Sequence, residues 1–184
     1  MVRAAIVLAS GQASRFGSNK LLARLNGKAL ITHALCAAQA APVERIVLVA
    51  RTGLPIPDDA RLVTVAGGET LSASLRAGLA AATDCEAAFV FLGDMPLVPH
   101  ELASELAARI GDALAAVPEV DGQPGHPVML SAHAFALAAQ LQGDEGLGKL
   151  LRGRADVLRL SVSDAGAVLD IDTPAGLAAI APAP

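Results

Sequence analysis

The chain has 184 residues, of which 53% are hydrophobic, with no Trp or Tyr and a formal net charge of -4 at pH 7. This length suits one ordinary domain with a large core, so we expect residues 1–184 to form a single domain. The apolar runs are too short to cross a bilayer, which excludes a membrane-spanning segment. The acidic balance, without a basic cluster, also argues against nucleic acid as a partner.

Strand-like and helical patterns alternate along most of the chain. This alternation predicts an α/β domain with an open, mostly parallel sheet and helices on both of its faces. The predicted strands cover residues 4–9, 45–50, 61–65, 87–92, 114–117, 127–130 and 157–160, and the predicted helices cover residues 30–40, 71–82, 99–110, 132–139, 146–151 and 174–180. Thr70 and Thr173 suit helix N-caps, and Pro174 suits the first turn of a helix.

The two cysteines, Cys36 and Cys85, lie far apart and have no metal-ligand spacing. We therefore expect buried thiols in a reducing compartment, and neither a disulfide nor a zinc site. The first predicted strand follows directly on the N-terminus, without the pattern of a secretory signal. These features favour a cytoplasmic location.

The most informative segment is LASGQASRFGSNK, residues 8–20, at the end of the first predicted strand. Gly11 and Gly17 let a ligand approach the backbone, while Arg15 and Lys20 add positive charge. Backbone N–H groups in a loop that leaves a buried strand favour anions, so we predict that the loop holds nucleotide phosphates. Its spacing fits neither a Walker A loop nor the dinucleotide-binding fingerprint. An ordinary strand-to-helix connection is the plainer alternative.

Two further loops carry candidate metal ligands. Asp94 follows the strand at 87–92 in FLGDMPLV, where a carboxylate that faces a phosphate loop predicts Mg²⁺ between them. Asp172 in LDIDTPAGL is a second candidate, and Asp170 is a weaker one because alternation directs the two side chains to opposite sides. The alternatives are a turn-forming role for Asp94 and a helix cap for Asp172.

The segment VAGGETLSASLRAGL follows the third predicted strand. Gly67 and Gly68 permit close approach to a flat ring, and Ser72 and Ser74 offer hydroxyls that can read a base or ribose. A plain loop and helix start is the alternative. Further on, His126 in GHPV is expected to be structural and not a general base.

These motifs together resemble those of the MobA/MocA-like nucleotidyltransferases, which are related to the molybdenum-cofactor transferases. LASGQASRFGSNK is similar to the signature LAAGxSxRMGxxK of that group, and FLGDMPLV, GHPVML, GDEGLGKLL and LDIDTPAGL follow in the same order. The resemblance covers nearly the whole chain. It implies a Rossmann-like, three-layer α/β/α domain that transfers a nucleoside monophosphate from a nucleoside triphosphate to a phosphorylated acceptor and releases pyrophosphate.

The resemblance also implies roles for individual residues. Lys20 and Arg15 would hold phosphates, and Asp94 would ligate Mg²⁺, with Asp172 as a second candidate ligand. The nucleotide is expected to contact Leu8, Ala9, Ser10, Gly11, Gly17, Lys20, Gly67, Gly68, Ser72 and Ser74. The GHPV and GDEG segments would lie near the acceptor, for which molybdopterin is favoured, and a molybdenum enzyme that receives the cofactor is a further expected partner.

Three alternatives stay open at this point. At the start of the signature, LAAG is typical of the cytidylyltransferase branch and LAGG of the guanylyltransferase branch. This chain has Ser10 at the third position of that motif. We favour CTP as the donor and keep GTP as the alternative. The acceptor is either molybdopterin or a sugar or polyol phosphate. A different class of protein, a non-catalytic accessory protein that binds the molybdenum cofactor, also remains.

Overall fold

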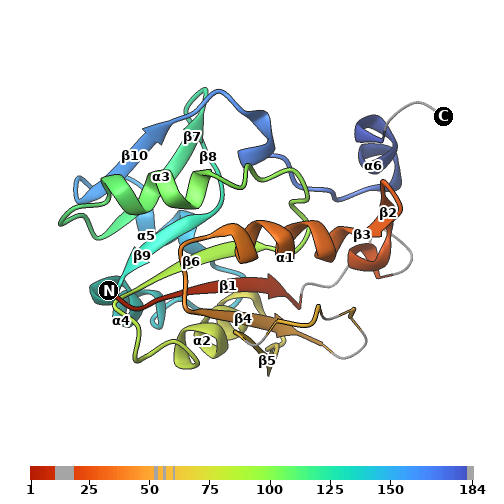
Figure 1. The fold of residues 1–184 in the computed structure, drawn as a ribbon. Coiled ribbons are helices and arrows are strands. Elements are labelled where there is room, and N and C mark those ends of the chain that lie inside the picture. The colour runs from red at the N-terminus through yellow and green to blue at the C-terminus, as the bar shows by residue number, and fades with distance from the viewer. Residues whose placement is uncertain (11–18, 52–53, 56, 60, 182–184) are drawn as a thin grey trace.

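A central sheet of eight strands organises the chain, and the computed structural model describes residues 1–10, 19–51, 54–55, 57–59 and 61–181 (Figure 1). The predicted positions of Gly11, Arg15 and Gly17 lie outside the described residues. The strands of this sheet are β1 (Arg3–Ala9), β4 (Arg45–Ala50), β5 (Leu62–Ala66), β6 (Ala87–Leu92), β7 (Ala115–Val120), β8 (Gln123–Pro124), β9 (Val128–Ser131) and β10 (Val157–Ser161).

The strand order is β10-β7-β9-β6-β1-β4-β5, and β8 pairs with β7 as a hairpin. Strands β5, β4, β1 and β6 are parallel neighbours, and β7 and β10 form another parallel pair. Strand β9 runs antiparallel to β6 and β7. The predicted mostly parallel sheet is therefore confirmed.

Helices cover both faces of the sheet (Figure 1). They are α1 (Leu30–Ala40), α2 (Leu71–Ala80), α3 (Leu102–Arg109), α4 (Ala132–Ala138), α5 (Leu147–Leu151) and α6 (Pro174–Ile180), with single 3₁₀ turns at Lys20–Leu22 and Ala165–Ala167. Helices α1 and α3 pack with one face of the sheet, and α2, α4 and α5 pack with the other. Alternation along β1 explains this division, because Ala5 and Val7 join the first core while Ile6 and Leu8 join the second.

A small hairpin of β2 (Arg24–Leu25) and β3 (Lys28–Ala29) was not predicted. Its turn residues Asn26 and Gly27 both have positive φ, at 51° and 77°, as a tight hairpin turn requires. The Asn-Gly pair is the sequence signal that would have identified it. The hairpin and α6 share a third core around Leu25, Leu30 and Ile171, which brings the C-terminal segment beside the start of α1.

Most predicted boundaries lie within about two residues of those observed, and two elements differ by more. Strand β7 continues through Pro118 to Val120 because it pairs there with β10 and β8, whereas the prediction ended the strand at 117. Helix α3 begins at Leu102 and not at 99, since the preceding residues form a turn. In the described part of the chain, no helix combines the length and apolar character needed to span a membrane.

Candidate active site

The side chain of Lys20 joins two aspartates from distant parts of the chain. Its Nζ atom lies 2.6 Å from Asp94 Oδ2 and 2.8 Å from Asp172 Oδ1. The lysine side chain is only 12% exposed, so most of its surface is covered by protein. The end of the predicted phosphate loop, the turn after β6 and the segment before α6 therefore meet at one point.

Backbone contacts fix this convergence. The N–H of Gly93 donates to Leu8 O at 2.9 Å, and the N–H of Ile171 donates to Asp94 O at 3.0 Å. A Cβ atom at Gly93 would lie 3.2 Å from Leu8 O and 3.0 Å from the Ile31 side chain, so a larger residue would push the turn away from β1. Asn19 caps the 3₁₀ turn by accepting from the Leu21 N–H at 3.2 Å, which positions Lys20.

The ammonium group is stabilised in its charged form. Burial acts to lower the pKa of Lys20, but the hydrogen bonds and negative charges of Asp172 and Asp94 outweigh it, so the pKa is raised. Lys20 therefore stays a cation at neutral pH. It can act as a phosphate ligand or a counter-charge, but not as a base.

A cavity of about 580 Å³ opens beside this cluster. Its walls come from the carboxyl end of β1, from the loop before α2 and from the turn after β6, and they include Leu8, Ala9, Ser10, Lys20, Gly68 and Asp94. Glu69, Thr70 and Asp144 also line it. The cavity thus lies at the carboxyl ends of parallel strands, where open α/β sheets bind ligands.

Two of the serines expected near the base are inside the protein. Ser72 and Ser74 are buried, at 0% and 1% exposure, and neither lines the cavity. Ser74 Oγ lies 2.5 Å from Ser10 Oγ and donates a hydrogen bond to Gly68 O at 3.3 Å. In this structure Ser74 therefore holds the two cavity walls together, and the surface facing the cavity is formed by Gly68 and the residues after it.

Gly67 and Gly68 in the same loop also pack closely against their neighbours. A Cβ atom at Gly67 would lie 2.3 Å from Ser10 Cβ, and one at Gly68 would lie 2.4 Å from Ala73 Cβ. Thr70 forms the predicted N-cap of α2, accepting from the Ala73 N–H at 3.2 Å. The backbone of this loop therefore packs closely against Ser10 at the end of β1 and against α2, and Gly68 lines the cavity.

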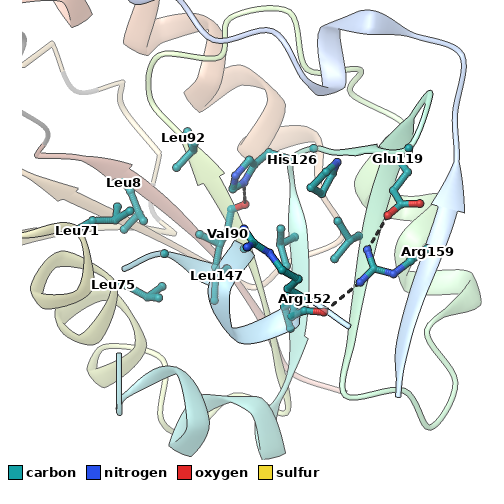
Figure 2. Close-up of a pocket in the computed structure, with 18 residues that line it drawn as sticks. Leu8, Leu71, Leu75, Val90, Leu92, Glu119, His126, Leu147, Arg152 and Arg159 are labelled. Carbon is teal, nitrogen blue, oxygen red and sulfur yellow. Dashed lines mark hydrogen bonds and ion pairs between the residues drawn. The ribbon is translucent and has the colours of Figure 1, made fainter. Parts of the chain in front are cut away.

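A second cavity, of about 450 Å³, adjoins the first (Figure 2). Leu8, Leu71 and Leu92 line both cavities. Figure 2 shows apolar side chains on one side of it and His126, Arg152, Arg159 and Glu119 around the rest. The GHPV and GDEG segments both contribute to this cavity, since His126, Gly146 and Leu147 line it.

His126 is held by a backbone group. Its Nδ1 atom lies 3.0 Å from Val90 O, and a carbonyl can only accept, so Nδ1 carries the proton in this contact. Burial lowers the pKa of His126, despite the opposing effect of the Val90 carbonyl and of the charges on Asp94 and Asp170. The ring is therefore neutral at pH 7, which fits the predicted structural role.

Sequence reasoning missed an arginine that is fixed between three elements. Arg159 on β10 contacts Glu119 Oε1 on β7 at 2.6 Å and donates to Leu151 O of α5 at 3.0 Å. Neither residue belongs to a motif, and their proximity follows from the pairing of β7 with β10. Arg152 lines the same cavity from the end of α5.

The aspartate pair fits a divalent cation. Two carboxylate oxygens already surround the single positive charge of Lys20, so their directions converge on one point. Within the described ranges, no group of three or more His, Cys, Asp or Glu side chains is arranged to hold a metal. Mg²⁺ commonly binds through one or two carboxylates together with substrate phosphates, which is what this pair could provide.

The chain is similar in sequence and in fold to known proteins. The structure of Rv0371c from Mycobacterium tuberculosis superposes with a TM-score of 0.85 at 26% identity, covering 98% of both chains, and the same protein has been solved in complex with manganese. A probable molybdenum cofactor guanylyltransferase of Pyrococcus furiosus is 36% identical over 61% of this chain and 58% of its own length. A 2-C-methyl-D-erythritol 4-phosphate cytidylyltransferase of Dehalococcoides mccartyi is 32% identical over 64% of this chain and 58% of its own.

The chain thus spans little more than half the length of these two relatives. The family assignment comes from a longer match, because residues 5–159 fit the family described as the MobA-like NTP transferase domain. That range contains most of β1, all of β2 to β9, Lys20 and Asp94. The chain therefore belongs to the MobA-like NTP transferase family, and its fold is that of a nucleotidyltransferase.

Proposed function

We propose that this protein transfers a nucleoside monophosphate from a nucleoside triphosphate to a phosphorylated acceptor, with CTP as the favoured donor and molybdopterin as the favoured acceptor. We also propose that residues 1–184 act as one domain. The observation that carries the proposal is the convergence of Lys20, Asp94 and Asp172 beside the 580 Å³ cavity. A cation and two carboxylates beside a cavity at the carboxyl ends of parallel strands suit a metal-bound triphosphate.

In the proposed reaction, an oxygen of the acceptor phosphate attacks the α-phosphorus of the triphosphate. A new O–P bond forms while the bond from the α-phosphorus to the bridging oxygen breaks, and pyrophosphate leaves with that oxygen. The acceptor phosphate is already ionised at neutral pH, so the reaction needs positioning and charge stabilisation rather than a strong base. The neutral His126, bonded to the Val90 carbonyl, fits this requirement.

Asp94 and Asp172 would hold Mg²⁺, which when bound neutralises charge on the phosphates. Lys20 and Arg15 would bind the phosphates that leave as pyrophosphate. Gly68 and the end of β1 would lie along the nucleoside. The manganese complex of Rv0371c supports the use of a divalent cation by proteins with this fold.

The second cavity is the proposed acceptor site. Its apolar walls suit a flat ring system, and its contact with the first cavity through Leu8, Leu71 and Leu92 would bring the acceptor phosphate toward the α-phosphate. Arg159 is already paired with Glu119, so Arg152 is the better candidate to bind an acceptor phosphate.

The donor base has two candidates, cytosine and guanine. The similar proteins include both a guanylyltransferase and a cytidylyltransferase by name. The Ser10 hydroxyl is engaged by Ser74, so the side chain that replaces the family alanine or glycine is turned toward α2. GTP therefore remains the second candidate donor.

Incubation with each of the four triphosphates, Mg²⁺ and molybdopterin, followed by mass analysis, tests the proposal. We expect a CMP adduct and pyrophosphate, and no adduct with the Asp94→Asn variant, whose fold is checked by circular dichroism. A GMP adduct would show that GTP is the donor and would leave the rest of the proposed function unchanged. A product with a sugar or polyol phosphate in a parallel panel would change the acceptor, and molybdopterin binding without turnover of any triphosphate would favour the accessory protein.

A further inference from the structure

The proposed metal site contains its own cation. Lys20 Nζ contacts Asp94 Oδ2 at 2.6 Å and Asp172 Oδ1 at 2.8 Å, which are the carboxylates that would bind Mg²⁺. The lysine side chain is 12% exposed and that of Asp94 is 21% exposed, so this pair is shielded from solvent. An ammonium group and a divalent cation that bind these oxygens together repel each other, so the metal binds more favourably once the lysine has moved away.

We propose that Lys20 competes with the divalent cation for Asp94 and Asp172, so that metal and nucleotide bind interdependently. This inference rests on the proposed function. The triphosphate offers Lys20 a new set of anionic partners, and movement of the lysine onto the phosphates frees the two carboxylates for the metal. The metal alone binds weakly because it must displace a shielded ammonium group, and it binds well once the phosphates attract that group.

The chain is built so that this exchange needs only one side chain to move. Lys20 is the first residue of a single 3₁₀ turn that is anchored by Asn19 and by the buried Leu21. The segments that carry the two aspartates are joined by a backbone hydrogen bond from the Ile171 N–H to Asp94 O. The backbone that carries Asp94 is therefore held in place, whereas the four-carbon stem of lysine can turn toward the adjoining cavity, which Lys20 also lines.

Binding of Mn²⁺ measured by electron paramagnetic resonance, with and without CTP or GTP, tests the proposal. Lys20→Met is nearly isosteric and removes the competing charge, so it should bind Mn²⁺ without nucleotide about tenfold more tightly than the wild type, an effect within the usual range of coupling between sites. Lys20→Arg keeps the charge and should stay as weak as the wild type. Lys149→Met is the matched control, because it removes an exposed lysine of α5 that pairs with Glu145. It should leave the affinity for Mn²⁺ unchanged.

A second measurement tests the proposal even if Lys20→Met is less stable than the wild type. Mn²⁺ should raise the thermal midpoint of Lys20→Met without nucleotide more than it raises that of the wild type. If the wild type binds Mn²⁺ with nucleotide but Lys20→Met gains no affinity without it, the competition is refuted and the proposed function stands. If no form binds Mn²⁺ even with nucleotide, the metal assignment in the proposed function fails as well.

Discussion

The hydroxyl of Thr173 accepts a hydrogen bond from the N–H of Gly176 at 3.0 Å and so caps helix α6. This contact separates two roles that the sequence had left open for the adjoining aspartate. The carboxylate of Asp172 instead contacts Lys20. The two neighbouring residues therefore have different roles: Thr173 caps the helix, and Asp172 contacts Lys20.

We predict that Asp172→Asn reduces metal-dependent pyrophosphate release by about 10- to 100-fold. It should change the free energy of unfolding by less than about 1 kcal/mol, because the aspartate is half exposed and its ion pair contributes little to stability. Thr173→Ala is the matched control, which should lose about 1 kcal/mol through the missing cap and keep its activity. Steady-state assays and urea unfolding distinguish the two. An active but destabilised Asp172→Asn would contradict the assignment.

The sequence predicted the main sheet and its covering helices because apolar periodicity and glycine or proline boundaries are local signals. It also placed Asp94 correctly at the end of a parallel strand, since that position follows from the strand alone. The contact of Lys20 with both Asp94 and Asp172 could not be predicted from the sequence, because the distances between these side chains depend on how three loops pack. The burial of Ser74 was missed for the same reason, as a helix start gives no sign of which side chains face β1.

The Ser10–Ser74 hydrogen bond should matter for both stability and nucleotide affinity. Ser74→Ala leaves the buried Ser10 hydroxyl without this partner, so we expect a loss of about 1–3 kcal/mol in unfolding free energy and a higher KM for the triphosphate. The double variant Ser10→Ala/Ser74→Ala should lose less than the sum of the single variants. Ser104→Ala, at an exposed position of α3, should have almost no effect. Strict additivity in urea unfolding would show that the two hydroxyls do not interact.

Arg152 should act on the acceptor and not on the donor. We expect Arg152→Gln to raise the KM for the phosphorylated acceptor about tenfold, which is the size of one lost hydrogen bond to a charged group, and to leave the KM for the triphosphate unchanged. Arg109→Gln, exposed at the end of α3, serves as the control. Equal increases in both KM values would mean that Arg152 does not belong to a separate acceptor site.

His126 should make the folded protein less stable in mild acid. Burial lowers its pKa from the ordinary value of 6.5, more than the Val90 carbonyl and the charges of Asp94 and Asp170 raise it. As pH falls below about 6.5, the unfolded chain takes up a proton that the folded chain resists, so the contribution of this group to stability is lost with falling pH. Stability above that pH is unaffected by this group.

Urea unfolding of the wild type, His126→Gln and His133→Gln at pH 7, 6 and 5 tests this linkage. His126→Gln should lose less stability between pH 7 and pH 5 than the wild type, whatever its stability at pH 7, because it lacks the group that titrates. His133 is exposed on α4, so His133→Gln should keep the wild-type dependence. Parallel curves for all three proteins would mean that His126 takes up its proton equally well in the folded and unfolded chain, which its burial argues against.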